Sequence, residues 1–397
     1  MLIDGPKGCG KTWTALNHAR SAVRFDGDAA ARDLVTISPE AVLAGPSPRL
    51  LDEWQLAPDI WNHVRHACDR SSESGRFLLT GSVVPADDAV RHSGAGRVAR
   101  VRMRPMSLYE SDQSSGLVSL GRLLDGQVVE PGSSEKRFTD VCEAICVGGW
   151  PWLIGQPAAT VQRRLRDYLE EVRRLEVDVA SQRSRNPVLV EKLLVSLARN
   201  TATTAPNSRL AYDTGNGDSM NHQTVRAYLD ALTRLFIVED LPAWPTHLRS
   251  RARLTKSPKR HFVDPSLAAA ALRAGPDSLH ADLETCGLLF ESLVVRDLRI
   301  YAGAHDCDVY HHRIEGGLEA DAVIRRRYTG EWIAVEVKLS NSADTIDHAA
   351  RSLLKIANTV DTAKTGPLAA LVVVTATGYT YTRPDGVIIT PITTLGP

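Results

Sequence analysis

Residues 5–12 combine closely spaced glycines with a lysine and a hydroxyl, the residue types that hold a phosphate chain. They read GPKGCGKT and fit the pattern G-x-x-x-x-G-K-[ST] at every fixed position. Glycines let successive backbone N–H groups turn toward phosphate oxygens, while Lys11 would reach the β- and γ-phosphates and Thr12 would hold Mg²⁺. The candidate nucleotide-binding residues are Gly5, Pro6, Lys7, Gly8, Cys9, Gly10, Lys11 and Thr12. The pattern predicts ATP and Mg²⁺ as ligands.

The sequence also predicts the strand and the helix that must position this loop. Residues 1–4 can form a short strand, and residues 12–24 contain few helix breakers, so the required order of strand, loop and helix is present. A glycine-rich surface turn beside a lysine is the alternative, which this context disfavours.

Two carboxylates end the next apolar run, residues 48–53. We expect a buried strand whose carboxyl end faces the metal and water, with Asp52 holding Mg²⁺ through water and Glu53 polarising the attacking water. Taken alone, a Leu-Leu-Asp-Glu string is more typical of a helix surface. A further run, residues 76–82, ends in hydroxyls, and Ser82 is the candidate side chain for sensing the γ-phosphate. Three apolar strands with polar carboxyl ends favour the nucleotide site.

The order of motifs resembles the prokaryotic AAA+-like ATPases whose carboxyl-terminal half is a domain of unknown function. It rests on the loop at 5–12, LDEWQ at 51–55, LTGS at 79–82, GAGR at 94–97, RPMSL at 104–108 and GGWP at 148–151. The resemblance implies that Arg97 is a charge-sensing or finger arginine, which points to a homo-oligomer. Relatives usually have a leader before the first strand that helps to cover the adenine, and this chain begins at the strand. We expect either a start upstream of Met1 or a less well held adenine.

Composition agrees with a cytoplasmic protein of several domains. A chain of 397 residues suggests two or three domains. Lys plus Arg number 47, and Asp plus Glu also number 47. The chain therefore has no net charge that would indicate a nucleic-acid or membrane partner. The six cysteines show no zinc-ligand spacing, and one of them lies in the phosphate loop, which suits a reducing cytosol. No run of about 18 apolar residues is present, so we expect no membrane span.

Turn-forming residues divide the chain. We expect an AAA+-like ATPase core at 1–110, a helical lid and connection at 111–187, a winged helix at 188–264 and a nuclease-like domain at 265–397. Residues 111–137 are rich in Gly, Ser and Pro and are expected to be a loop-rich connection rather than a core element.

The predicted winged helix, which the resemblance implies, is followed by a basic stretch at 247–260 without an acidic residue. Its candidate nucleic-acid contacts are Arg251, Arg253, Lys256, Lys259 and Arg260. Such a stretch can lie along the phosphate backbone of DNA or RNA. The alternative is a solvated loop or a winged helix used for protein contacts.

The carboxyl-terminal region brings a second kind of chemistry. Residues 334–338 read as a strand in which Glu336 and Lys338 point to the same face. Carboxylates on a neighbouring strand and a helix, Asp321 and Glu291, can converge on them to bind Mg²⁺, with Lys338 orienting water. The arrangement resembles the PD-(D/E)xK restriction-endonuclease-like fold, although Ala320 stands where the proline would. Both an active metal site and a remnant fold are compatible with the sequence.

The sequence therefore predicts an α/β protein with a P-loop parallel sheet, a helical lid, a winged helix-turn-helix and a carboxyl-terminal α/β restriction-endonuclease-like domain. The leading function is Mg²⁺-dependent ATP hydrolysis that moves the domains against each other, near nucleic acid. The alternatives are an ATP-gated endonuclease and a non-enzymatic nucleotide switch that binds a partner protein.

Overall fold

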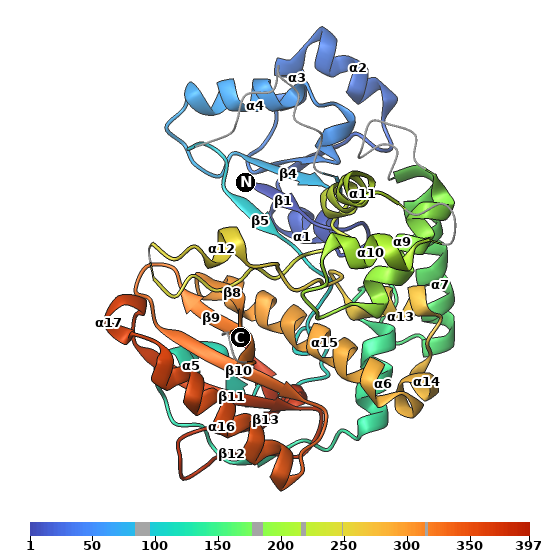
Figure 1. The fold of residues 1–397 in the computed structure, drawn as a ribbon. Coiled ribbons are helices and arrows are strands. Elements are labelled where there is room, and N and C mark those ends of the chain that lie inside the picture. Colours follow the sequence, from blue (N-terminus) through green and yellow to red (C-terminus); the bar gives the residue numbers. More distant parts are fainter. Residues whose placement is uncertain (84–95, 177–185, 216–219, 248, 314–316) are drawn as a thin grey trace.

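The computed structural model describes residues 1–83, 96–176, 186–215, 220–247, 249–313 and 317–397 (Figure 1). Its elements form an amino-terminal α/β unit, a helical middle region and a carboxyl-terminal α/β unit. Within the described residues, no helix is long and apolar enough to cross a membrane.

The amino-terminal unit is built on a parallel sheet of five strands in the order β2-β3-β4-β1-β5. The strands are β1 (Leu2–Asp4), β2 (Ser21–Arg24), β3 (Arg49–Asp52), β4 (Phe77–Gly81) and β5 (Arg100–Arg102). The helices are α1 (Lys11–His18), α2 (Ala29–Ile37), α3 (Pro39–Leu43), η1 (Trp54–Leu56) and α4 (Ile60–Asp69). Ile3 and Leu50 pack in a cluster with Ala15 of α1, while Leu51 packs in another with Val64 of α4. Because both faces are covered, the strands read as continuous apolar runs.

The middle region is a body of helices around α13, a nearly all-apolar helix that contacts α6, α7 and α9. A helix that is apolar all round is stable only inside such a body. The helices are α6 (Phe138–Val147), α7 (Ala158–Glu171), η2 (Val172–Glu176), α9 (Pro187–Arg199), α10 (Asn207–Asp213), α11 (His222–Arg234), α12 (Ala252–Thr255), α13 (Pro265–Leu272) and α14 (Pro276–Ala281).

A short antiparallel hairpin follows α11, with Val238 opposite Phe262 and Leu241 opposite Lys259. Helices α9, α10 and α11 precede it, and Asn221 caps the start of α11, where its side chain accepts a hydrogen bond from the Thr224 N–H at 2.8 Å. Three helices and a hairpin follow the order expected for a winged helix, which stays a prediction.

The carboxyl-terminal unit holds a mixed sheet in the order β7-β12-β13-β11-β10-β9-β8. Its main strands are β8 (Cys307–Arg313), β9 (Glu319–Arg326), β10 (Trp332–Lys338), β11 (Leu368–Thr375), β12 (Tyr379–Thr382) and β13 (Ile388–Pro391). Helix α15 (Leu283–Ala304) shares a core with Ile324 and Val335, whereas α16 (Ala343–Thr359) shares another with Val323 and Ala334. Neighbouring residues of β9 and of β10 therefore point to opposite faces of the sheet, one covered by α15 and the other by α16. The last elements are α17 (Thr362–Thr365), η3 (Ile392–Thr394) and β14 (Leu395–Gly396).

Residues 118–133 belong to this unit rather than to a connection, which corrects the sequence expectation. Strand β6 (Val118–Ser119) pairs with β14, and β7 (Gly132–Ser133) pairs with β12. Helix α5 (Leu120–Leu124) contacts β10 and β11, and Leu120, Leu123 and Leu124 are buried. Apolar residues lie between the Gly and Ser residues that suggested a loop, and they complete the core of the sheet.

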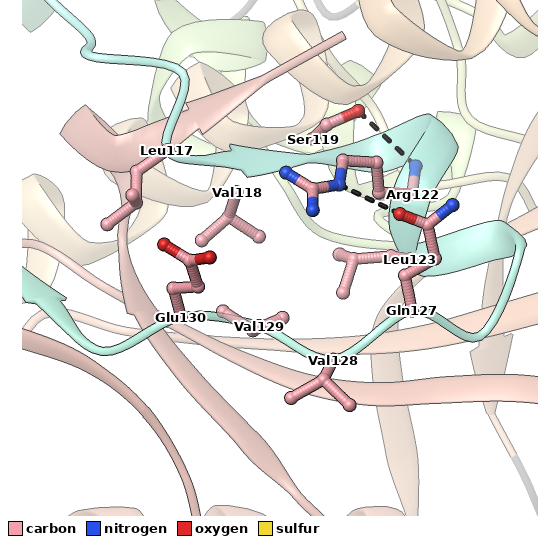
Figure 2. A pocket seen from close by; sticks show the side chains of 9 residues that line it. All are labelled: Leu117, Val118, Ser119, Arg122, Leu123, Gln127, Val128, Val129 and Glu130. Atoms are coloured by element: carbon pink, nitrogen blue, oxygen red, sulfur yellow. Dashed lines mark hydrogen bonds between the residues drawn. The ribbon is translucent and has the colours of Figure 1, made fainter.

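A small pocket lies beside β6 and α5 (Figure 2). Its volume is about 40 Å³, and the side chains of Arg122 and Gln127 meet at its edge, with Arg122 Nε donating to Gln127 Oε1 at 2.9 Å. A pocket of this size has room for little more than a water molecule.

Candidate functional site

The predicted phosphate loop joins the carboxyl end of β1 to the first residue of α1. Gly8 has φ 78° and Gly10, which precedes α1, has φ 100°. Both values lie in the left-handed region that favours glycine, so the sequence spacing is what lets this backbone form. The loop therefore has the backbone and the helix start that a phosphate group requires.

Lys11 is buried, and its Nζ donates a hydrogen bond to the backbone carbonyl of Pro6 at 2.8 Å. The ammonium group is therefore held against the loop that precedes it. A cation in this place fits a triphosphate.

Asp52 connects the loop to the neighbouring strands. Its Oδ1 accepts a hydrogen bond from Thr12 Oγ1 at 2.8 Å and another from Thr80 Oγ1. Asp52 ends β3 and Thr80 lies in β4, next to β1, so three adjacent parallel strands bring these oxygens to one edge of the sheet. The hydroxyl of Thr12 and the carboxylate of Asp52 are hard oxygen ligands suited to Mg²⁺, which supplies charge neutralisation for phosphate when it is bound.

Glu53 follows with its backbone in the left-handed region, at φ 54°. Its carboxylate accepts hydrogen bonds from Ser82 Oγ at 2.7 Å and from Gln55 Nε2, and its backbone N–H donates to Thr80 Oγ1 at 3.1 Å. A non-glycine residue in this conformation costs about 1 kcal/mol, which the surrounding bonds must offset. The strained turn aims the carboxylate along the carboxyl edge of the sheet.

Ser82, predicted to sense the γ-phosphate, donates its hydroxyl to Glu53 at 2.7 Å, and its sensing role stays a prediction. The sequence reasoning did not assign Thr80 and Gln55, which contact Asp52 and Glu53. Thr80 lies in the LTGS motif and Gln55 in the LDEWQ motif, so the polar residues of these two motifs could have indicated the contacts.

Arg97 lies far from this edge of its own subunit. Arg97 lies just before the start of β5, and its guanidinium pairs with Asp69. Asp69 is the last residue of α4, the helix that precedes β4 in the chain. Because the strands are parallel, both positions lie at the amino edge of the sheet, opposite the phosphate loop. A sensing role for Arg97 therefore requires a neighbouring subunit. Residues 94 and 95 of the same motif lie outside the described residues.

The GGWP motif brings the middle region onto the phosphate loop. A Cβ atom placed on Gly8 would lie 2.6 Å from Trp152 Nε1, so the indole rests directly on the loop. The turn before it is fixed by Asp264 Oδ2, which accepts from the Gly149 N–H at 3.1 Å, and by Ser266 Oγ, which accepts from Trp150 Nε1 at 3.0 Å. Trp152 is thus held against the predicted phosphate loop by the helical body.

The basic stretch separates into exposed and buried residues. Arg251 and Lys256 are exposed, whereas Lys259 and Arg260 make internal ion pairs, Arg260 with Asp240. Lys259 is 3% exposed, so its prediction as a nucleic-acid contact is wrong. The Arg253 side chain lies outside what the structure describes.

Lys256 also lines a pocket of about 470 Å³, together with His247, His312, Asp361 and Lys364. The charged side chains of this pocket are Lys256, Lys364 and Asp361, and Lys364 pairs with Asp361 at 2.7 Å.

The predicted carboxyl-terminal metal ligands do come together, but around an ammonium group. Lys259 Nζ contacts Glu291 Oε1 at 2.6 Å, Glu319 Oε1 at 2.7 Å and Asp321 Oδ1 at 3.0 Å. Glu336 pairs with Lys338 at 2.8 Å. A divalent cation does not fit this arrangement, and among the described residues no group of three or more His, Cys, Asp and Glu side chains is placed to hold a metal. Glu291, Asp321 and Glu336 therefore do not form the predicted metal site here.

Three family models match separate parts of this chain. Residues 1–111 match the model described as an AAA domain, and residues 138–278 and 286–395 match the domains of unknown function DUF8612 and DUF4143. The amino-terminal unit is therefore an ATPase-like domain. The prediction of a P-loop ATPase followed by a domain of unknown function is confirmed at this level.

Similarity to individual proteins is distant. Two proteins described as uncharacterized, from Mycobacterium bovis and Mycobacterium tuberculosis, are each 25% identical over 362 residues, covering 89% of this chain and 73% of the relative. Among solved structures, the Walker-type ATPase PABY2304 of Pyrococcus abyssi matches with a TM-score of 0.40 and 13% identity, covering 68% of this chain and 90% of that chain.

Proposed function

We propose that this protein binds ATP with Mg²⁺ and hydrolyses the bond between the β- and γ-phosphates. The observation that carries the proposal is the set of contacts at the carboxyl edge of the sheet, where Asp52 accepts from Thr12 and Thr80 while Ser82 and Gln55 hold Glu53. Lys11 would bind the phosphates, Asp52 would orient the metal-binding hydroxyl, and Glu53 would accept a proton from the attacking water.

The same proposal includes movement of the domains against each other. Two contacts support it, because each joins the nucleotide site to the rest of the chain. Trp152 of the middle region rests on Gly8, and Glu239 at the hairpin pairs with Arg104, which follows β5. A phosphate group that enters the loop must alter the surroundings of Trp152, so the nucleotide state can be transmitted to the helical body.

A role near nucleic acid is the second candidate, favoured by the exposed cations Arg251 and Lys256. A nucleotide switch without turnover is the remaining alternative. ATP turnover distinguishes it from the ATPase, and stimulation of turnover by DNA or RNA tests the nucleic-acid role.

The decisive experiment measures nucleotide affinity and phosphate release in the full chain, with and without DNA. Lys11→Ala should lose tight ATP binding, because backbone dipoles alone must then hold the phosphates. Glu53→Gln should bind ATP and lower kcat by at least about 100-fold, the lower range for loss of a general base. Glu40→Gln, an exposed carboxylate of α3, is the matched control and should behave like the parent. Equal behaviour of the Lys11 and Glu53 variants would refute the separate roles.

A further inference from the structure

The acidic centre of the carboxyl-terminal sheet contains a cation that the chain itself supplies. Lys259 comes from the hairpin of the middle region, where its backbone pairs with Leu241. Its Nζ reaches carboxylates on helix α15 and strand β9, at 2.6 Å from Glu291, 2.7 Å from Glu319 and 3.0 Å from Asp321. An ammonium group has three donors, and these three oxygens can accept all of them.

The remaining oxygens of the centre are also constrained. Asp321 Oδ2 accepts the Val337 N–H at 2.8 Å, and Glu336 Oε1 pairs with Lys338. Glu336 Oε2 is buried and has no hydrogen-bond partner among the described residues. The centre thus holds four carboxylates and two lysines, and one buried carboxylate oxygen remains unsatisfied.

We propose that Lys259 is the resident cation of this centre. The ammonium takes the place that a divalent metal would need, so the wild-type site binds no Mg²⁺ and cuts no nucleic acid. Its role is to join the hairpin to the carboxyl-terminal sheet. The physical reason is that Mg²⁺ requires near-octahedral oxygen ligands close to the ion, whereas these oxygens are already directed at Nζ. An ammonium and a divalent cation in one small centre would also repel each other strongly.

The centre is then a latent metal site. Removing the lysine leaves several buried carboxylates that repel one another, and a divalent cation can relieve that repulsion. The binding free energy would appear as stabilisation of the folded chain by mass action.

The test uses the full chain without nucleotide and measures the melting temperature in chelator, Mg²⁺, Mn²⁺ or Ca²⁺. Lys259→Met keeps much of the buried stem and removes the charge. Its Tm in chelator should fall by roughly 10 °C, because a buried ion pair is broken on one side. Metal should raise the Tm of this variant by several degrees and leave the wild type unchanged. Lys364→Met is the matched control, since Lys364 is exposed and pairs with Asp361 at the surface, and it should show neither effect.

A second variant covers the case in which Lys259→Met does not fold. Lys259→Met combined with Glu291→Gln and Asp321→Asn removes the cation together with two of its carboxylates, so it should fold and should not respond to metal. Failure of both variants to fold would overturn the proposal, because the lysine would then act through more than its charge.

Two results with the wild type would also overturn it. One is a metal-dependent rise in Tm that equals the rise in Lys259→Met. The other is cleavage of plasmid DNA that depends on metal and is abolished by Asp321→Asn. None of these outcomes depends on ATP, so they remain separate from the test of the ATPase.

Discussion

Arg104 donates two hydrogen bonds to Glu239, from Nε at 2.8 Å and from Nη2 at 2.6 Å. This bidentate pair, the Arg104–Glu239 fork, joins the segment after β5 to the start of the hairpin. Two parallel hydrogen bonds of this kind fix the relative orientation of the two side chains. Burial by itself would raise the pKa of Glu239, but the guanidinium groups of Arg104, Arg299 and Arg102 outweigh burial and hold the pKa well below its usual range. Glu239 is therefore a fixed negative charge between the ATPase-like domain and the rest of the chain.

Glu239→Gln should destabilise the protein by about 3 kcal/mol at neutral pH, because it leaves buried arginines without their counter-charge. Urea unfolding measures the change. Since the pKa is lowered in the folded protein, the stabilisation is present above the ordinary Glu pKa and is lost as the pH falls toward the folded value. Asp361→Asn, which breaks an exposed pair with Lys364, is the control and should change the unfolding free energy far less. Equal losses in the two variants would contradict the role of the fork.

Trp152 should report nucleotide binding. Its indole contacts the phosphate loop at Gly8, so ATP should change the intrinsic fluorescence of the full chain. Trp152→Phe should remove most of that change while the protein still folds, because the indole is partly exposed and its loss leaves no large cavity. Trp13→Phe, an exposed indole on α1, is the comparison. If the signal disappears in Trp13→Phe and persists in Trp152→Phe, the contact with Gly8 does not respond to phosphate.

Arg97 should act only between subunits. Arg97→Ala is expected to lower ATP turnover without weakening ATP binding much, by analogy with arginine fingers supplied in trans. Mixing Arg97→Ala with Lys11→Ala should restore activity, since each protein then supplies what the other lacks. A monomeric mass in ATP together with no rescue would show that Arg97 serves mainly its ion pair with Asp69.

The exposed cations of the basic stretch should set any salt dependence of nucleic-acid binding. Replacing Arg251 and Lys256 by Gln removes two phosphate contacts, so the slope of log affinity against log salt should become shallower by about 2. Lys136→Gln, an exposed lysine near β7, is the matched control. Binding that keeps its slope in the double variant would assign the stretch to protein contacts or to solvent.

Buried histidines should make the protein sensitive to mild acid. Burial lowers the pKa of His311 and of His312 to about 4, with the charges of Lys259 and Lys256 respectively adding to the effect. The unfolded chain binds protons at these groups near pH 6.5 and the folded protein does not, so stability falls as the pH drops from about 6.5 to about 4.

His311→Gln keeps a donor for the carbonyl of Ser257, 3.1 Å from His311 Nε2, but cannot be protonated. The difference in unfolding free energy between parent and variant should therefore change with pH across that window. Burial raises the pKa of Glu291 to about 8 and that of Glu336 to about 7, so protonation of these groups stabilises the folded protein as the pH falls, opposite to the histidines. Both groups are present in parent and variant, so the difference in unfolding free energy removes their contribution. A difference that is constant with pH would show that His311 is not a neutral buried group.

The geometry of the predicted phosphate loop, and the placement of Asp52 and Glu53 at the same edge of the sheet, could be anticipated because the sequence signals are local. The loop is contiguous in sequence, and Asp52 and Glu53 follow an apolar run that parallel pairing brings beside it. The hydrogen bond from Ser82 to Glu53 was not predictable in the same way, since a hydroxyl at a strand end can face either a ligand or a neighbouring carboxylate.

The basic stretch shows where sequence reasoning stops. Lys256 and Lys259 lie three residues apart in one run of positive charge, yet the first is exposed and the second is buried among carboxylates. Its partners come from α15 and β9, whose approach depends on tertiary packing. Strands of two residues such as β6 and β7 likewise leave too short a pattern to be recognised.

The pairing of β6 with β14 affects the order in which the molecule can be completed during synthesis. The hydroxyl of Ser114 bonds to the carbonyl of Leu395 across a separation of 281 residues. A nascent chain emerges amino terminus first, so the ATPase-like domain can form early, whereas β6 must wait for the residues of β14. Until β10 and β11 have emerged, Leu120 and its buried neighbours lack these partners and offer apolar surface to chaperones.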